Sequence, residues 1–174
     1  SRRQRQMCIR DRYDIPQEYV LSFNGGALTE NKDNKLLYFE GLSFEKTKEI
    51  FEFGLQQDVC QHIYTKDKVY VYNLSESEAK RIREQQVECE IMTENTMDFL
   101  KDEPISKILF QNTDVPYLMS LEPQMKAITE GMCAVSYSSN RYMEFNKIGV
   151  DKGQGLKHLA QIIGVDLSEC IAVG

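Results

Sequence analysis

The sequence predicts an α/β protein. An antiparallel-type sheet with helices on one face, over about residues 35–146, is flanked by pieces of a second, parallel α/β sheet. In the middle of the chain, helix and strand patterns follow the order α-β-β-α-α-β-α-β-β. Near the end, a helix with a glycine stop precedes a run of only apolar residues. Such a run is typical of a strand in a parallel sheet, where both faces are covered.

The first expected element is a short apolar run at residues 19–23, followed by Asn24, Gly25 and Gly26. This pattern predicts a buried strand that ends in a turn. The Asn-Gly pair is also frequent in tight β-hairpins, so a plain hairpin stays open as an alternative.

Four polar residues mark the expected helix starts in the middle region. Ser43 can cap a helix that runs to about residue 57, and Thr93 can cap a shorter one. Ser75 and Glu78 have the spacing of a capping box, in which the serine accepts from the third amide and the glutamate accepts from the cap amide. Asp114 starts a further helix toward residue 130.

The same region contains alternating or continuous apolar runs. They predict strands at residues 59–64, 68–72, 105–110, 132–137 and 142–145. Pro123 lies inside the helix that begins at Asp114, and we expect it to break that helix and restart it, because proline lacks the amide that an internal turn needs.

The last segment begins with Asp151, which can cap a helix over residues 152–163 that stops at Gly164. An apolar strand is expected at residues 170–173, and Gly174 follows it. Ligands of parallel sheets bind just beyond the carboxyl ends of strands, so an active-site loop is expected to begin at this point.

Composition excludes several classes of function. The net charge is -6, and no basic stripe is present, which argues against nucleic acid or an anionic membrane surface as partner. No apolar run approaches the ~18 residues of a membrane helix. The five cysteines are widely spaced and form no CxxC pair, so we expect reduced, mostly buried thiols in a cytoplasmic protein.

Residues 1–12 differ from the rest of the chain, because five of them are arginine and only three arginines follow. A basic, disordered tail is one interpretation. The string also resembles translated sequencing-adapter sequence, and on that interpretation it is set apart from the fold, as an expression tag would be.

Chemistry visible from local patterns is limited. His62 and His158 are isolated and are interpreted as structural or surface residues. Lys152 is more informative, because it begins a helix whose free amides and dipole favour an anion. It could clamp a phosphate or carboxylate, or it could be a solvated surface lysine.

The segment from Ser138 to Gly153 reads Ser-Ser-Asn-Arg-Tyr-Met-Glu-Phe-Asn-Lys-Ile-Gly-Val-Asp-Lys-Gly. It resembles the return from cap to core in Cof-type phosphatases of the haloacid dehalogenase (HAD) superfamily. Those proteins carry a serine, an aromatic residue, a Leu/Met-Glu pair and then Lys-Gly opening a helix. Residues 23–27 resemble the Asn-Gly-Ala handover from core to cap, with one extra glycine. Residues 171–174 resemble the strand before the acidic Gly-Asp-x-x-Asn-Asp loop of that group.

The resemblance implies a complete α+β cap at residues 35–146, between incomplete Rossmann-like core pieces at residues 13–34 and 147–174. It implies a Mg²⁺-dependent phosphatase of small phosphorylated metabolites, foremost sugar phosphates, acting through an aspartyl-phosphate intermediate. Lys152 would be the catalytic lysine that binds phosphate, and Asn24 and Gly25 would also contact substrate. The Asp-x-Asp nucleophile and the Mg²⁺ ligands are expected outside this chain, so we expect the chain itself to be inactive.

Two other classes of function stay open. The middle region could be a non-catalytic, regulatory α+β module that binds a small ligand, or it could be a self-association domain. The sequence predicts neither the phosphorylated substrate, nor the cap residues that would contact it, nor the oligomeric state.

Overall fold

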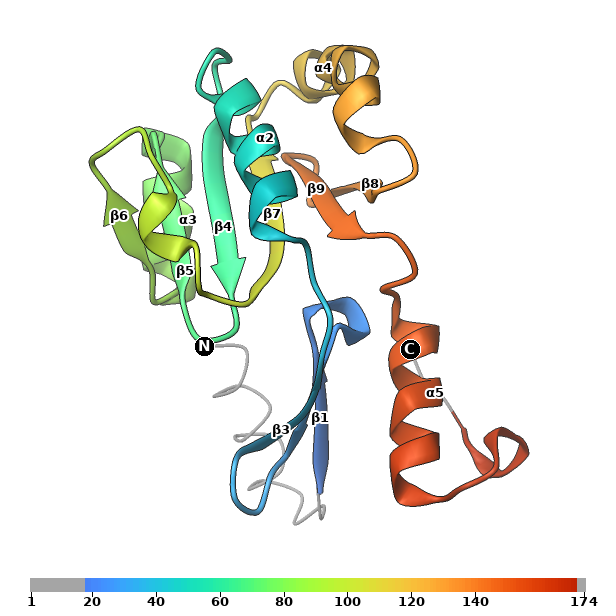
Figure 1. Ribbon diagram of the computed structural model, residues 1–174. Helices are drawn as coiled ribbons and strands as arrows, with labels where there is room; N and C mark the ends of the chain where they lie inside the picture. Colours follow the sequence, from blue (N-terminus) through green and yellow to red (C-terminus); the bar gives the residue numbers. More distant parts are fainter. Residues whose placement is uncertain (1–17, 172–174) are drawn as a thin grey trace. The chain divides into compact units, whose positions relative to one another are not determined.

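The computed structural model describes residues 18–171, and their contacts divide them into two units (Figure 1). The larger unit is Gly41–Ile148, and the smaller unit combines residues 18–40 with residues 149–171. These limits differ by a few residues from the expected boundaries at 34/35 and 146/147. Residues 1–12 and Gly174, on which two of the expectations rest, lie outside the described residues.

The smaller unit contains a three-stranded antiparallel sheet of order β1-β2-β3 with helix α5. Helix α5 contacts β1, β2 and the 3-10 turn η1. The bounds of its elements are β1 Tyr19–Ser22, η1 Phe23–Gly25, β2 Ala27–Glu30, β3 Lys35–Phe39, α5 Lys152–Ile163 and the 3-10 turn η3 Leu167–Glu169. Because Ser22 pairs with Ala27, the turn after β1 closes a β-hairpin, which was the alternative that the sequence had left open.

The larger unit is built on a six-stranded sheet of order β6-β5-β4-β7-β9-β8. The pairing of β5 with β6 is parallel, and every other pairing in this sheet is antiparallel. The strands are β4 Cys60–Thr65, β5 Val69–Tyr72, β6 Glu90–Met92, β7 Ile105–Gln111, β8 Cys133–Ser138 and β9 Tyr142–Lys147.

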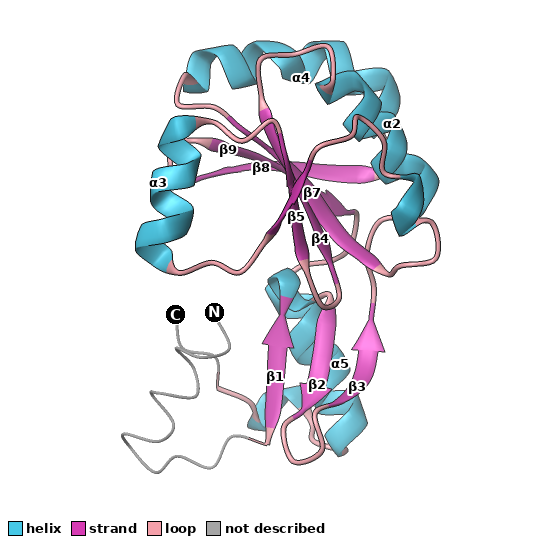
Figure 2. Ribbon diagram, turned by 90° about the vertical axis from the view of Figure 1, so that its left-hand side faces the viewer, coloured by secondary structure: helices cyan, strands magenta, loops and turns pink. Residues whose placement is uncertain are grey.

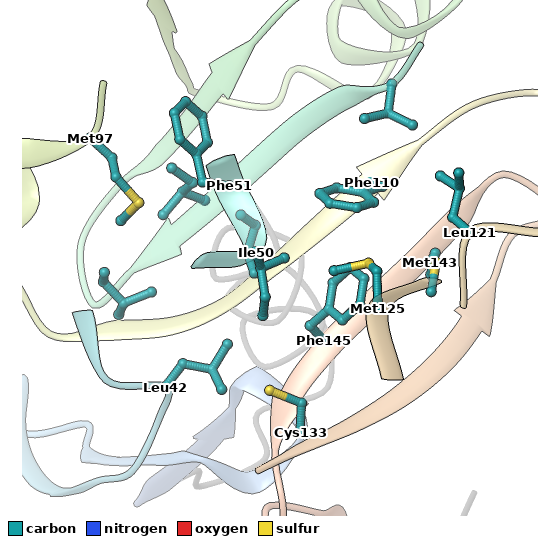
Figure 3. Packing of buried hydrophobic residues seen from close by; sticks show 14 of the residues in the cluster. Leu42, Ile50, Phe51, Met97, Phe110, Leu121, Met125, Cys133, Met143 and Phe145 are labelled. Atoms are coloured by element: carbon teal, nitrogen blue, oxygen red, sulfur yellow. The ribbon is translucent and has the colours of Figure 1, made fainter. Parts of the chain in front are cut away.

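Helices α2 (Phe44–Gly54) and α4 (Val115–Thr129) pack on the apolar face of this sheet. The largest buried side chains of the unit meet there, among them Ile50 and Phe51 of α2 and Phe110 and Phe145 of the sheet (Figure 3). The Phe110 and Phe145 rings meet edge to face, with their centroids 5.0 Å apart. This cluster is the hydrophobic core of the larger unit.

Helix α3 (Glu76–Gln85) lies on the opposite face of the sheet (Figure 2). His62, Leu109 and Glu144 are cross-strand partners and therefore share one face, and Glu78 of α3 contacts His62 on that face. The expectation of helices on one face only is therefore wrong. Helix α3 joins β5 to the parallel strand β6, and such a crossover passes over one face of the sheet.

The predicted N-caps are largely confirmed. Side chains of Ser43, Ser75, Asp114 and Asp151 each accept a hydrogen bond from the backbone of the helix that follows. The capping box at Ser75 is only half formed, because the Glu78 side chain turns toward the sheet instead of the cap amide.

Other local predictions were wrong. Helix α4 continues through Pro123, whose exposed position leaves the carbonyl of Met119 open to water. Thr93 starts no α-helix, and a 3-10 turn, η2, forms later at Asp98–Leu100. Cys170 and Ile171 are not in a strand, and the rest of the expected strand at residues 170–173 lies outside the described residues. No helix within residues 18–171 has the length and apolar character to cross a membrane.

Candidate functional site

The start of helix α5 brings the predicted site residues of the smaller unit to one place. Asp151 caps the helix, and its Oδ1 accepts from the Gln154 amide at 2.8 Å. Lys152 is the first helical residue, and its side chain is exposed. The amides of Lys152 and Gly153 are the first-turn donors that the cap does not take up, so positive potential accumulates beside the lysine.

The turn after β1 packs directly on this helix start, backbone against backbone. A Cβ on Gly25 would lie 2.4 Å from the Asp151 carbonyl oxygen, and one on Gly155 would lie 2.6 Å from the Gly25 Cα. Gly25 also has a φ of +95°, a conformation that L side chains rarely adopt. Only glycine at both positions allows this approach, which places Asn24 and Gly25 at the end of α5 where Lys152 begins.

Asn24 takes its place in the turn through a left-handed backbone conformation, with φ 57° and ψ 26°. Asparagine adopts this conformation more readily than most residues because its side chain can hydrogen-bond locally. The turn of Asn24 and the buried Gly25 therefore lies beside the exposed Lys152 at the start of α5. This helix start carries a cation and free helix amides, which are groups that can bind a phosphate.

Tyr38 and His158 form a second cluster in the smaller unit that the sequence did not predict. Their rings lie 4.3 Å apart, and the Tyr38 hydroxyl donates to Glu40. Burial, followed by this hydrogen bond, raises the pKa of the Tyr38 hydroxyl to about 12. The hydroxyl therefore stays protonated at neutral pH, and His158 packs as a structural residue.

In the larger unit, the face that carries α3 is rich in polar side chains. Lys107 forms an ion pair with Glu144, which also accepts from the Ser138 hydroxyl. The Lys107 ammonium lies 5.0 Å from the centroid of the Tyr64 ring. Because Glu144 already neutralises the lysine, this cluster suits hydrogen bonding to hydroxyl groups better than binding of an anion. This pair could not be predicted from the sequence, since Lys107 and Glu144 come from strands far apart in the chain.

A buried carboxylate anchors α3 to the same face. Glu78 is 1% exposed, accepts from the Tyr142 hydroxyl at 2.7 Å, and lies within 3.6 Å of His62 and 3.5 Å of Arg141. Burial, followed by the charges of Lys107 and Arg141, lowers the pKa of His62 to about 4. His62 is thus neutral at physiological pH, in agreement with its interpretation as a structural histidine.

Residues 18–171 do not fit a metal centre. Among them, no three histidine, cysteine, aspartate or glutamate side chains gather closely enough to hold an ion. Two aspartates flank α5, and both side chains already accept hydrogen bonds from backbone amides. Asp151 caps α5, and Asp166 caps η3. The described part of the chain therefore assigns no residue to a metal and no carboxylate to a nucleophile.

Comparison with known proteins connects this arrangement to one family. The family model of haloacid dehalogenase-like hydrolases matches residues 4–174. A candidate phosphatase of Streptococcus pyogenes is 23% identical over 159 residues, which are 90% of this chain and 57% of the relative.

Solved structures show the same fold. A haloacid dehalogenase-like hydrolase from Bacteroides thetaiotaomicron has a TM-score of 0.74 at 24% identity, over 90% of this chain and 58% of that protein. The subclass IIB sugar phosphatase BT4131 has a TM-score of 0.73 at 14% identity, over 94% of this chain and 58% of its own. This chain spans less than two thirds of the length of each of these proteins. The chain belongs to the haloacid dehalogenase-like hydrolase family, and its resemblance to the Cof type is confirmed.

Proposed function

We propose that this chain is part of a Mg²⁺-dependent phosphatase that hydrolyses small phosphorylated metabolites, foremost sugar phosphates, through an aspartyl-phosphate intermediate. The observation that carries the proposal is the surface at the start of α5, where Lys152 lies beside the turn of Asn24 and the buried Gly25. It combines a lysine with free helix amides, and the Gly25–Gly155 approach holds the turn against the helix.

Lys152 would bind a non-bridging oxygen of the phosphoryl group and neutralise part of its charge. The adjacent amides of Lys152 and Gly153 would donate to a second oxygen. Both contacts gain strength as charge builds on the equatorial oxygens during phosphoryl transfer. Asn24 would orient the group through its side-chain amide.

Mg²⁺, when bound, would neutralise the phosphoryl oxygens further and align the nucleophile. Its ligands and the nucleophilic aspartate would come from outside the described residues, because residues 18–171 hold no metal-binding cluster. On this account the 174-residue chain has no phosphatase activity of its own. Magnesium-dependent turnover of a sugar phosphate by the purified chain would contradict that expectation.

Sugar phosphates are proposed first among substrates because a neighbouring fold belongs to a sugar phosphatase. Cytoplasmic residence is proposed because the four described cysteines are free, as is usual in reducing compartments.

Calorimetric titration of the chain with glucose 6-phosphate tests the phosphate site. Replacing Lys152→Met should weaken binding about ten- to a hundredfold, the usual worth of a hydrogen bond to a charged group. Lys157→Met is the matched control, because Lys157 is an exposed lysine on the same helix and should leave binding unchanged. Equal losses in the two variants, or no binding by the unaltered chain, would contradict the proposed site.

A further inference from the structure

A cavity of about 240 Å³ lies within the larger unit, at the end of the sheet where β5 and β7 finish and β4 begins. Its lining is polar and comes from three segments of the chain, residues 58–60, 73–77 and 111–113. Its polar residues include Asp58, Asn73, Ser75, Ser77, Gln111 and Asn112. One water molecule occupies ~30 Å³ in the liquid, so the cavity volume corresponds to roughly eight water molecules. This volume suits a molecule smaller than a typical drug.

Gln111 is the best-buried of these polar side chains and is only 2% exposed. Its Oε1 accepts from the Ser75 hydroxyl at 2.9 Å. Its amide nitrogen has no hydrogen-bond acceptor among residues 18–171 and is not one of their enclosed unpaired atoms, so it is reached from the cavity that the side chain lines. A bound molecule with an acceptor could therefore take up this donor.

The start of α3 provides further donors. Ser75 caps this helix and accepts from the Glu78 amide at 3.2 Å. The amides of Glu76 and Ser77 precede the first intrahelical bond and remain available to an acceptor. The cavity thus combines an unpaired side-chain amide with a helix start.

The surrounding charges argue against an anion as occupant. Asp58 contributes a carboxylate to the lining, and Glu76 is acidic in the first turn of α3. The nearest guanidinium, that of Arg141, already donates to Ser77 and lies 3.5 Å from Glu78. Burial raises the pKa of the Cys60 thiol, which also lines the cavity, to about 12, so it stays neutral.

We propose that this cavity of the larger unit binds a small uncharged polyhydroxylated molecule, a monosaccharide or sugar alcohol. Each hydroxyl of such a molecule can both donate to Asp58 and accept from Gln111 or from the helix amides.

The cavity lies at one end of the six-stranded sheet, and the two connections to the smaller unit lie at the other end of this sheet. Leu42, near the start of the larger unit, bridges to Ile105 at the first residue of β7, and Asn146 near the end of β9 pairs with Lys107. Gln111 is the last residue of β7. At ~3.3 Å per residue, roughly 20 Å of strand separates the cavity from the end of the sheet through which the chain enters and leaves the unit. An occupant would act as an effector of the larger unit and not as the phosphorylated substrate.

A ¹⁵N NMR titration of the 174-residue chain with xylitol and with D-glucose tests the proposal. Saturable shifts are expected at the amides of Ser75, Ser77, Asn112 and Thr113. Gln111→Met should weaken binding about tenfold, as loss of one hydrogen bond does. Gln161→Met is the matched control, since Gln161 is exposed on α5 and should change nothing.

Asp58→Asn is a second variant in case Gln111→Met unfolds. The Asp58 side chain is exposed, so replacing it should not disturb the core. Asp58→Asn should also weaken binding. Each neutral compound is titrated to roughly 100 mM. This concentration would saturate a site with a Kd of about 1 mM, because it is a hundred times that Kd. Absence of saturable shifts in that range would overturn the proposal, as would shifts caused there by inorganic phosphate but not by the two neutral compounds.

Discussion

The two faces of the six-stranded sheet are made by the same strands and have opposite character. On the face under α2 and α4, β4, β7 and β9 contribute Ile63, Ile108 and Phe145, which are cross-strand partners and fully buried. On the other face, the adjacent positions of the same strands contribute His62, Leu109 and Glu144.

The difference shows how one strand pattern can serve packing and chemistry together. Successive side chains of a strand point to opposite faces, so each strand supplies the core and the polar face in alternation. The apolar face gains stability from close packing. The polar face buries charges that are costly unless paired, and its pairs therefore fix an arrangement more than they add stability.

Truncation in the apolar face should have the largest effect. Phe110 is fully buried, and Phe110→Ala should lower the free energy of unfolding of the larger unit by about 3–5 kcal/mol, through lost burial and the cavity that remains. Urea unfolding followed by amide signals of the larger unit measures this. The control Phe99→Ala removes a ring that is 57% exposed and should cost much less; equal costs would contradict the assignment of the core.

Breaking the ion pair of the polar face should have an intermediate effect. Lys107→Met leaves Glu144, which is 9% exposed, without its cation and should cost about 2–3 kcal/mol. The double variant Lys107→Met/Glu144→Met should recover most of that loss, because no charge remains unpaired. Lys68→Met breaks an exposed pair with Glu90 and should cost much less, because solvent screens the pair. A double variant no more stable than the single one would show that the pair is not the cause.

Acid should weaken the polar face by a smaller amount. The pKa of His62 is lowered from 6.5 to about 4 by burial and by Lys107 and Arg141, so the unfolded chain binds more protons between these pH values. Stability should therefore fall as pH drops from 6.5 toward 4, by about 1–2 kcal/mol, with Glu78 at 3.6 Å limiting the loss. Thermal unfolding across this range should depend less on pH in His62→Gln. An unchanged slope would assign the dependence to other groups.

The sequence predicted most of the larger unit because its signals are local. Ser43, Ser75 and Asp114 cap helices through residues three positions away, as Asp151 does in the smaller unit, and alternation marks the central strands. The same signals failed for β2, β3 and β6, where a polar turn or exposed edge positions hide the pattern. The low helix propensity of proline did not end helix α4 at Pro123, because this helix packs on the sheet through the side opposite to Pro123.

The candidate site was likewise predicted from the sequence only in part. Lys152 and the Asn24-Gly25 turn were predicted from short motifs, but the Gly25–Gly155 approach depends on packing between segments more than a hundred residues apart. The Lys107–Glu144 pair and the cavity at Gln111 depend on sheet register, which one sequence does not specify across long connections.

The most direct test of the proposed function is to locate phosphate on the chain by a ¹⁵N NMR titration with inorganic phosphate. Saturable shifts are expected at the amides of Asn24, Gly25, Lys152 and Gly153. They should be lost in Lys152→Met but not in Lys157→Met. Shifts confined to the larger unit, or identical in the two variants, would contradict the assignment of the α5 start as the phosphate-binding surface.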